Sequence, residues 1–283
     1  MGVWCVNVPL KVLLTNDDGL YSHGLRSLWR ELKEVSEVSV VVPEQPRSAT
    51  GKSLTLHKPL RLNRTHVAGL GTAYIISGSP GDAIQMAFHK VLSWTPDVVA
   101  SGINPGDNTT IDTLLTSGTV AAAIEASLLG VPSVAFSMKI PHDYFVRESE
   151  YVQLFDKAAK IAAGIVKWVG NKGLPDEVDL LNVNFPMVIT KDTEIHVTRL
   201  ARMKFENYVI ERRDPQGKLY YWLGGTVTAN IERGTDLYSL EVERAISITP
   251  IKLDMTAPID KEYFNQMFSS LNIKGMIFED ENE

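Results

Sequence analysis

Short apolar runs alternate with helical patterns along the first half of this chain, and this alternation restricts the folds open to it. Each run is rich in Val, Leu, Ile or Ala and ends in a polar loop. Repeated strand–loop–helix units form a doubly wound, mostly parallel α/β sheet with right-handed crossovers, which is a Rossmann-like fold. The expected strands are Val12–Leu14, Val38–Val42, Ala73–Ile76, Asp97–Ala100 and Val131–Phe136.

Four polar loops follow strands of this set, at residues 16–19, 44–53, 77–82 and 101–119. The carboxyl ends of parallel strands lie at one edge of a sheet, and ligands bind in the crevice outside that edge. We therefore expect the four loops to meet there and to supply the functional side chains.

The first loop contains two adjacent carboxylates, Asp17 and Asp18, directly after a buried strand. Like charges roughly 4 Å apart repel by on the order of 4 kcal/mol at an effective dielectric constant of about 20. No Lys or Arg lies between Lys11 and Arg26, so the local sequence provides no counter-charge. A hard divalent cation would offset the repulsion, as would a raised pKa on one carboxylate. The run 16–19 also suits a plain turn or a helix cap, and both interpretations remain open.

The later loops offer neutral oxygen atoms and helix starts. Residues 101–108 read as a turn by default, but their amide oxygens also suit a hard cation. Ser79, Pro80 and Asp82 make a well-formed helix start, which is either a cap alone or an anion site. Ser117-Gly118-Thr119 precedes an Ala-rich helix, and hydroxyl groups and a glycine at such a position favour phosphate.

The run Gly51-Lys52-Ser53 imitates the end of a nucleotide-binding P-loop. The imitation fails because Pro46 stands where that motif needs its first glycine. In addition, residues 54–59 alternate like a strand and meet a proline instead of opening a helix. We therefore do not expect an NTPase P-loop here.

Composition narrows the possible partners. The 283 residues carry a net charge of −6, which argues against sequence-independent binding to nucleic acid or to an anionic membrane. One cysteine, Cys5, allows no disulfide within the chain, and the N-terminus lacks the features of a signal peptide. No apolar run approaches the length of a membrane span. We expect a cytoplasmic protein without nucleic-acid or membrane partners.

The pattern changes beyond residue 140. We expect a catalytic core over residues 9–140 and a C-terminal segment over 141–283 that completes the fold. The segment should contain a helix near 148–169, strands at 178–185, 194–200 and 245–249, and a final helix near 259–271. Asp214-Pro215-Gln216-Gly217 indicates a β-hairpin over about 205–223. Because this hairpin is aromatic and an isolated hairpin is marginally stable, we expect it to pack against another subunit.

Several motifs together resemble the SurE family of stationary-phase survival proteins. They occur in order over nearly the whole chain, and the Asn-Asp-Asp-Gly and Ser-Gly-Ile-Asn signals are specific in combination. The motifs are residues 14–19, Arg47-Ser48 before 53–56, 101–104 with Gly106 and Asn108, 117–123, 181–186, 221–224, 234–236 and 247–250.

This resemblance implies a metal-dependent phosphatase that acts on nucleoside 5′-monophosphates, and in some members on 3′-monophosphates and polyphosphate. One divalent cation, Mg²⁺ or Mn²⁺, would be held in each subunit, and one aspartate would also orient or deprotonate the attacking water. Homodimers or homotetramers would form partly through the hairpin and the C-terminal tail. The implied metal ligands are Asp17, Asp18, Ser48 and Asn104, of which Asp17 and Asp18 are also the catalytic residues; the implied phosphate-binding residues are Asn108, Ser117, Gly118 and Thr119.

Two stretches depart from the commonest pattern of that family. Lys52 stands where many relatives carry Asn, and Tyr21-Ser22-His23-Gly24 replaces a His-Ala-Pro-Gly run. Lys52 could place a point charge near phosphate, so a binding role for this position is left open. The alternative function is a non-catalytic sensor of nucleotide or phosphate on the same scaffold.

Overall fold

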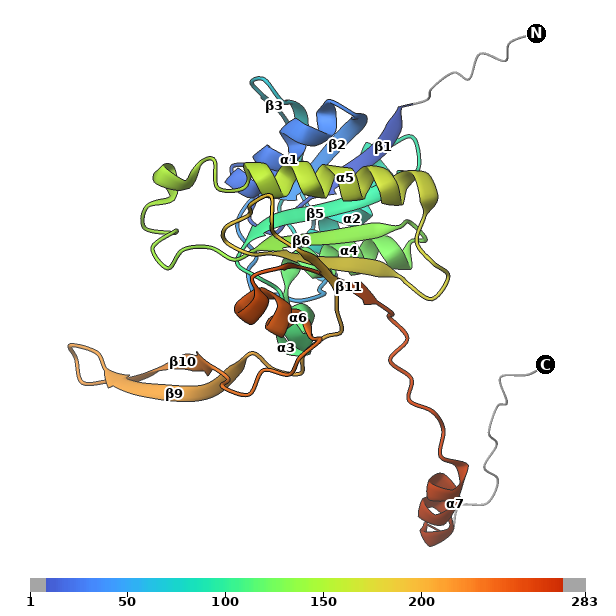
Figure 1. The fold of residues 1–283 in the computed structure, drawn as a ribbon, viewed down its shortest axis with the longest axis vertical. Helices are drawn as coiled ribbons and strands as arrows, with labels where there is room; N and C mark the ends of the chain where they lie inside the picture. The colour runs from blue at the N-terminus through green and yellow to red at the C-terminus, as the bar shows by residue number, and fades with distance from the viewer. Residues whose placement is uncertain (1–8, 272–283) are drawn as a thin grey trace. The chain divides into compact units, whose positions relative to one another are not determined.

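A nine-stranded sheet forms the centre of the structure, a computed structural model that describes residues 9–271 (Figure 1). The strand order is β3-β4-β2-β1-β5-β6-β7-β11-β8. Neighbouring strands from β4 to β7 are parallel, whereas β3 and β11 run antiparallel to β4 and β7. The expected mostly parallel α/β fold is therefore confirmed. The strands are β1 (Leu10–Thr15), β2 (Ser36–Pro43), β3 (Leu62–Val67), β4 (Gly71–Ile76), β5 (Val98–Pro105), β6 (Ser133–Met138), β7 (Leu180–Phe185), β8 (Ile195–Val197) and β11 (Ile246–Ile251).

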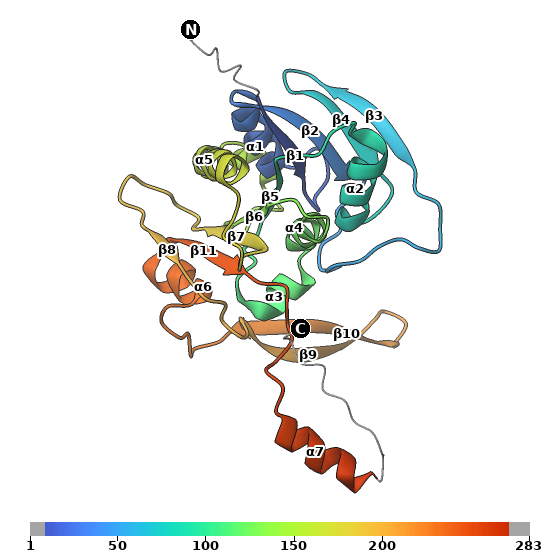
Figure 2. The ribbon, with the colours of Figure 1, turned by 90° about the vertical axis from the view of Figure 1, so that its right-hand side faces the viewer.

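Helices cover both faces of this sheet (Figure 2). On one face lie α1 (His23–Lys33) and α5 (Asp156–Lys172), and on the other lie α2 (Pro80–Met86), the π-helical turn η1 (Ala87–Val91) and α4 (Gly118–Leu128). The central strand β1 contributes to both layers, because Val12 and Leu14 belong to the α1–α5 core and Leu13 belongs to the α2–α4 core. This burial on two faces explains why the strands are continuously apolar rather than alternating.

The start of α2 has the expected cap. The Ser79 hydroxyl accepts from the Asp82 amide at 3.1 Å, and the Asp82 carboxylate accepts from the Ser79 amide at 2.8 Å. Asp82 also accepts from the amide and hydroxyl of Thr55 at 2.9 and 2.6 Å. These polar groups are satisfied within the protein, so this helix start acts as a cap that also fixes the preceding loop.

Three parts of the chain differ from the sequence-based expectation. Strand β3 and helix α3 (Thr110–Thr116) were not predicted. The helix expected over 148–169 is instead a 3-10 turn, η2 (Glu148–Tyr151), followed by α5, which begins at Asp156. The reason is aromatic packing, since the buried Tyr144 ring contacts Tyr151 and Phe155 at centroid distances of 5.9 and 6.0 Å and draws residues 144–155 into a compact turn.

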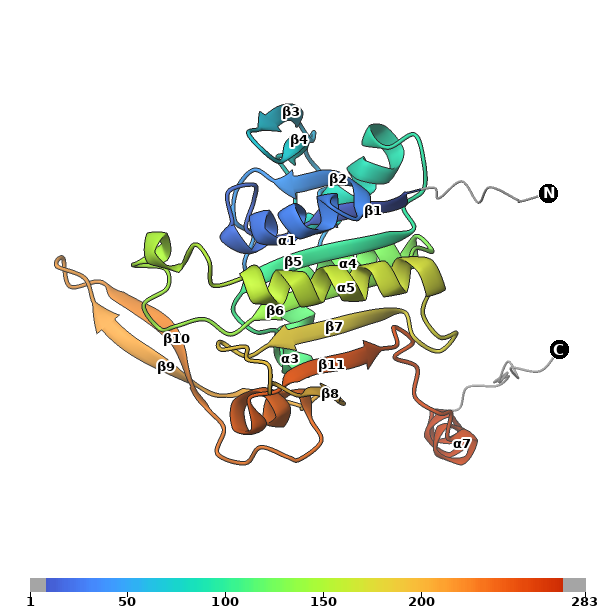
Figure 3. The ribbon, with the colours of Figure 1, turned by 45° about the horizontal axis from the view of Figure 1, so that its top comes forward.

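The predicted hairpin is present and is longer than expected. Strands β9 (Phe205–Arg213) and β10 (Leu219–Val227) form a separate antiparallel pair that stands away from the main sheet (Figure 3). In its turn, Asp214 accepts from the amides of Gln216 and Lys218, and Gly217 adopts a positive φ of 83°. Most of its side chains are exposed, and Leu223 is 88% exposed.

The chain continues through α6 (Asp236–Tyr238) and the π-helical turn η3 (Ser239–Glu243) into β11. A second unit begins at Leu253, and its described part, residues 253–271, contains α7 (Lys261–Ser270), which begins where the Asp260 carboxylate accepts from the Tyr263 amide at 3.0 Å. The division expected near residue 140 stays a prediction. Cys5 and residues 272–283 of the expected C-terminal segment lie outside the described residues. Within residues 9–271, no helix is both long and apolar enough to cross a membrane.

Candidate active site

The candidate site begins at the turn that follows β1. The Asn16 side chain accepts from the Gly19 amide at 3.1 Å and donates to the Gly19 carbonyl at 3.0 Å, which closes the turn. Gly19 has a φ of 90°, a conformation that residues with a Cβ rarely adopt. The turn therefore holds Asp17 and Asp18 at the carboxyl edge of the sheet, between the ends of β2 and β5.

Asp17 is the residue at which three loops meet, and it is only 4% exposed. Its carboxylate accepts a hydrogen bond from the Thr119 hydroxyl, and its carbonyl accepts from the Arg47 amide at 2.8 Å. Gly118 lies directly against it, since a Cβ at residue 118 would stand 2.7 Å from the Asp17 Cβ. The loops after β1 and β2 and the start of α4 are thus joined at one residue, through its carbonyl and its carboxylate.

Asp18 has a carboxyl oxygen without a partner. Its Oδ2 is buried and has no hydrogen-bond partner. Burial, then repulsion from Asp17 and from Glu148, raises the pKa of Asp18 well above its ordinary value. Burial also raises the pKa of Asp17, and neither aspartate forms an ion pair within residues 9–271.

This environment fits a hard divalent cation. A buried carboxylate oxygen without a donor and a second carboxylate beside it are stabilised when a cation binds between them. Within the described part of the chain, no three His, Cys, Asp or Glu side chains cluster as a metal site, so further ligands would have to be neutral oxygens. The serine and asparagine predicted from the sequence are of that kind.

Ser48 and Asn104 lie on the two chain segments next to the turn after β1. Ser48 is exposed and follows Arg47, whose amide is bonded to Asp17. Asn104 lies on β5 beside β1, and its amide nitrogen donates to the Gly106 carbonyl at 2.6 Å, which leaves the amide oxygen to act as an acceptor. Within residues 9–271, no hydrogen bond joins either side chain to Asp17 or Asp18, so their place in a shared ligand set stays a prediction.

The four predicted phosphate-binding residues divide into two groups. Ser117, Gly118 and Thr119 start α4 beside Asp17, and the Ser117 hydroxyl accepts from the Val120 amide at 3.1 Å. Asn108 is instead tied to the ends of β6 and β7, because its side chain donates to Ser137 at 2.7 Å and its backbone bonds to Asn182 and Asn184. The phosphate contacts of all four residues stay predictions.

Two buried carboxylates brace the loop that follows β5 and carries Asn108. Asp107 accepts from the Lys204 ammonium at 2.6 and 2.7 Å, and both side chains are almost fully buried. Asp236 accepts from the Thr110 amide at 2.7 Å and from the Ala201 amide at 2.8 Å. Residues 199–204, which we call the root segment because they lead into β9, therefore fix this loop.

A family model described as survival protein SurE matches residues 12–207 of the chain. The chain belongs to the SurE family. It is 45% identical over 253 residues to the 5′-nucleotidase SurE of Thermococcus gammatolerans, covering 89% of this chain and 94% of that protein. The 5′-nucleotidase SurE of Hyperthermus butylicus is 43% identical over 87% of this chain and 86% of its own length.

A solved structure supports the same assignment. The crystal structure of the SurE protein from Aquifex aeolicus matches with a TM-score of 0.73 and 33% identity, covering 92% of this chain and 98% of that one. The resemblance expected from the sequence motifs is therefore confirmed at the level of family and fold.

Lys52, which departs from the commonest SurE pattern, forms an ion pair with a residue of α4. Its ammonium pairs with the buried Glu125 carboxylate of α4 at 2.6 Å, and Glu125 also accepts from the Gln85 side chain. The Gly51 amide donates to the Thr116 carbonyl at 2.8 Å in the same region. Lys52 thus joins the loop after β2 to α4.

Sequence reasoning missed two parts of this SurE site. Arg47, whose amide is bonded to Asp17, is half-buried, and its Nε is buried without a hydrogen-bond partner, so this group has a donor left for an anion. The segment 144–152 contributes Tyr144, Phe145 and Glu148 to a pocket of about 540 Å³ that also includes Asp18. The sequence signal for this wall is its aromatic content, and Tyr144 and Phe145 lie before the helix that was predicted over 148–169.

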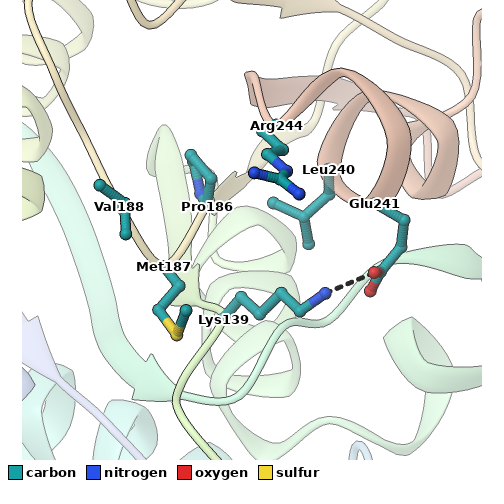
Figure 4. A pocket seen from close by; sticks show the side chains of 7 residues that line it. All are labelled: Lys139, Pro186, Met187, Val188, Leu240, Glu241 and Arg244. Carbon is teal, nitrogen blue, oxygen red and sulfur yellow. Dashed lines mark hydrogen bonds and ion pairs between the residues drawn. The ribbon is translucent and has the colours of Figure 1, made fainter.

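A second cavity of about 410 Å³ lies farther along the same edge of the sheet, next to β6, β7 and η3 (Figure 4). Lys139 lies along this cavity and forms an ion pair with Glu241, while Met187 and Leu240 supply apolar surface. It holds no pair of adjacent carboxylates, and the charge of its lysine is neutralised. This cavity therefore lacks the features that mark the site at Asp17 and Asp18.

Proposed function

We propose that this chain is a metal-dependent 5′-nucleotidase that releases phosphate from nucleoside 5′-monophosphates. The relatives from Thermococcus gammatolerans and Hyperthermus butylicus carry the name 5′-nucleotidase SurE and align over most of the chain. The observation that carries the proposal is the Asp17–Asp18 pair, in which Asp17 is buried and the buried Oδ2 of Asp18 has no hydrogen-bond partner. A sensor that only binds phosphate has no use for such a pair.

In this proposal Asp17, Asp18, Ser48 and Asn104 hold one divalent cation, Mg²⁺ or Mn²⁺, in each subunit. When bound, the cation would supply a Lewis acid for a phosphate oxygen and lower the pKa of a water molecule. The hydrogen bond from Thr119 and the contact with Gly118 fix the orientation of the Asp17 carboxylate. One of the two aspartates orients or deprotonates the attacking water.

The remaining groups would bind the phosphate. The backbone N–H groups at the start of α4 point out of the helix end next to Asp17, where a helix N-terminus favours negative charge. The unpartnered Nε of Arg47 would donate to a phosphate oxygen. Water then attacks phosphorus directly, since adjacent aspartates do not match the spacing of a nucleophile and a separate acid.

Phosphate release tests this proposal. Purified protein is assayed with nucleoside 5′- and 3′-monophosphates and with polyphosphate, each with Mg²⁺, Mn²⁺ or EDTA. We expect turnover of 5′-monophosphates that EDTA abolishes, and loss of turnover in Asp17→Asn and Asp18→Asn with an unchanged circular dichroism spectrum. Full activity in EDTA would contradict the scheme, and nucleotide binding without turnover would favour the sensor.

We also propose that the β9–β10 hairpin mediates assembly into a homodimer or homotetramer. Its exposed aromatic and aliphatic side chains form an apolar surface that water does not stabilise. A cytoplasmic location stays a prediction.

A further inference from the structure

We propose that the pocket formed by segment 144–152 and the turn after β1 binds the nucleoside part of the substrate, with Phe145 and Tyr21 as stacking surfaces for the base. This inference rests on the proposed function, because it assumes that phosphate is cleaved at Asp17 and Asp18. It adds the feature that distinguishes a nucleotide from any other phosphate monoester.

The first argument is position and size. Asp18 lines the pocket, so a phosphate held there would carry its organic group into the adjoining space. The volume of about 540 Å³ lies within the range of ordinary small-molecule sites. Pro46 and Pro105 also line it; Pro46 belongs to the loop that carries Ser48, and Pro105 follows Asn104 at the end of β5.

The second argument is the aromatic surface. Phe145 is 71% exposed and Tyr21 is 75% exposed, although both line a concave pocket. The Phe145 ring packs against the buried Tyr144 ring in a T-shaped contact, at a centroid distance of 5.2 Å and an interplanar angle of 83°. This contact orients the Phe145 ring while most of its surface stays available for stacking.

The third argument is charge. Asp18 and Glu148 are both acidic, and no Lys or Arg is among the described residues that line the pocket. The one histidine among those lining residues, His23, lies 3.8 Å from Glu148. A second phosphoryl group would be repelled here, whereas a neutral nucleoside with hydroxyl and N–H donors would not. The pocket therefore favours a nucleoside monophosphate over a diphosphate.

The test compares substrates with and without a base. With Mg²⁺ or Mn²⁺, kcat/KM is measured for AMP, ADP and ribose 5-phosphate on wild type and Phe145→Ala. Stacking on an aromatic ring strengthens binding of a base by about 5- to 150-fold. We expect Phe145→Ala to lower kcat/KM for AMP within that range and to leave ribose 5-phosphate unchanged, and ADP to be a poorer substrate than AMP.

A matched control and a binding measurement complete the design. Trp168 is also an aromatic residue and is 67% exposed, but it lies on α5 outside the pocket. Trp168→Ala should therefore leave kcat/KM unchanged for both AMP and ribose 5-phosphate. Calorimetric titration of the metal-free protein with adenosine should show binding that Phe145→Ala weakens and Trp168→Ala does not.

Two results would overturn the inference. Equal loss of kcat/KM for AMP and ribose 5-phosphate in Phe145→Ala would show that this residue shapes the whole site. If Phe145→Ala leaves both kcat/KM for AMP and adenosine binding unchanged, the base does not contact Phe145. If the wild type releases phosphate from none of the esters with any cation, the proposed function fails, and adenosine binding still decides whether the pocket takes a nucleoside.

Discussion

Replacing Gly118 with alanine should disable the site while leaving the fold intact. The new Cβ would stand 2.7 Å from the Asp17 Cβ and 2.8 Å from its Oδ2, short of the ordinary contact distance of 3.4 Å by roughly 0.7 Å. Because the Thr119 hydroxyl and the Arg47 amide hold Asp17, the clash cannot be relieved without moving the carboxylate. Overpacking of this size costs about 1–3 kcal/mol.

The expected magnitudes for stability and turnover differ. Alanine is a better helix former than glycine by about 1 kcal/mol, so the net loss of unfolding free energy should not exceed about 2 kcal/mol. A misplacement of about 1 Å in a reacting group lowers turnover by about 100-fold. We therefore expect Gly118→Ala to lower kcat for AMP by about two orders of magnitude in a protein that still folds.

The assay is phosphate release from AMP at saturating Mn²⁺, with urea unfolding measured on the same samples. Gly164→Ala is the matched control, because Gly164 lies inside α5 and a Cβ added there would have nothing within 4 Å of it. In this control the unfolding free energy should rise by about 0.5–1 kcal/mol and the activity should be unchanged. Wild-type turnover in Gly118→Ala would refute the role given to the packing of Asp17.

Three further predictions concern charge and assembly. Arg47→Gln should raise KM for AMP without changing the thermal midpoint, and an unchanged KM would remove Arg47 from phosphate binding. Lys204→Met should lower the unfolding free energy by about 3–5 kcal/mol because it leaves the buried Asp107 carboxylate unpaired, and adding Asp107→Leu should recover most of that loss in urea titrations. Burial alone would raise the pKa of Asp107, but the Lys204 ammonium and its hydrogen bonds hold that pKa below the ordinary value. The stability that this pair contributes is therefore fully present above about pH 4 and is lost as the pH falls through the folded-state pKa of Asp107. The double variant should lack this decline. Leu223→Glu should shift the protein to a smaller species in light scattering with an unchanged thermal midpoint, since the side chain is 88% exposed, and an unchanged mass would remove Leu223 from the proposed interface.

Features set by local pattern could be predicted from the sequence. The apolar runs of β1, β2 and β5 are buried on both faces, so their composition alone identifies parallel strands. The start of α2 depends on Ser79 and Asp82, which lie three residues apart, and the hairpin depends on the turn at Asp214. Each of these signals is contained within a few neighbouring residues.

Features set by distant contacts could not be predicted. Strand β3 is polar and largely exposed, so it carries little apolar pattern and owes its place to pairing with β4. The bond from Thr119 to Asp17 joins residues 102 positions apart, and the bond from Lys204 to Asp107 joins residues 97 apart. Such contacts exist only once the sheet has brought the loops together.

The hairpin can be regarded as an insertion with adjacent ends. The Thr228 amide donates to the Lys204 carbonyl at 2.9 Å, so the chain leaves and returns at nearly the same point. Lys204 itself stays on the side of the root segment, where it holds Asp107. A short turn joining residues 204 and 228 would excise both strands and keep that buried ion pair, so the contribution of subunit contacts to turnover could be separated from the chemistry of a single chain.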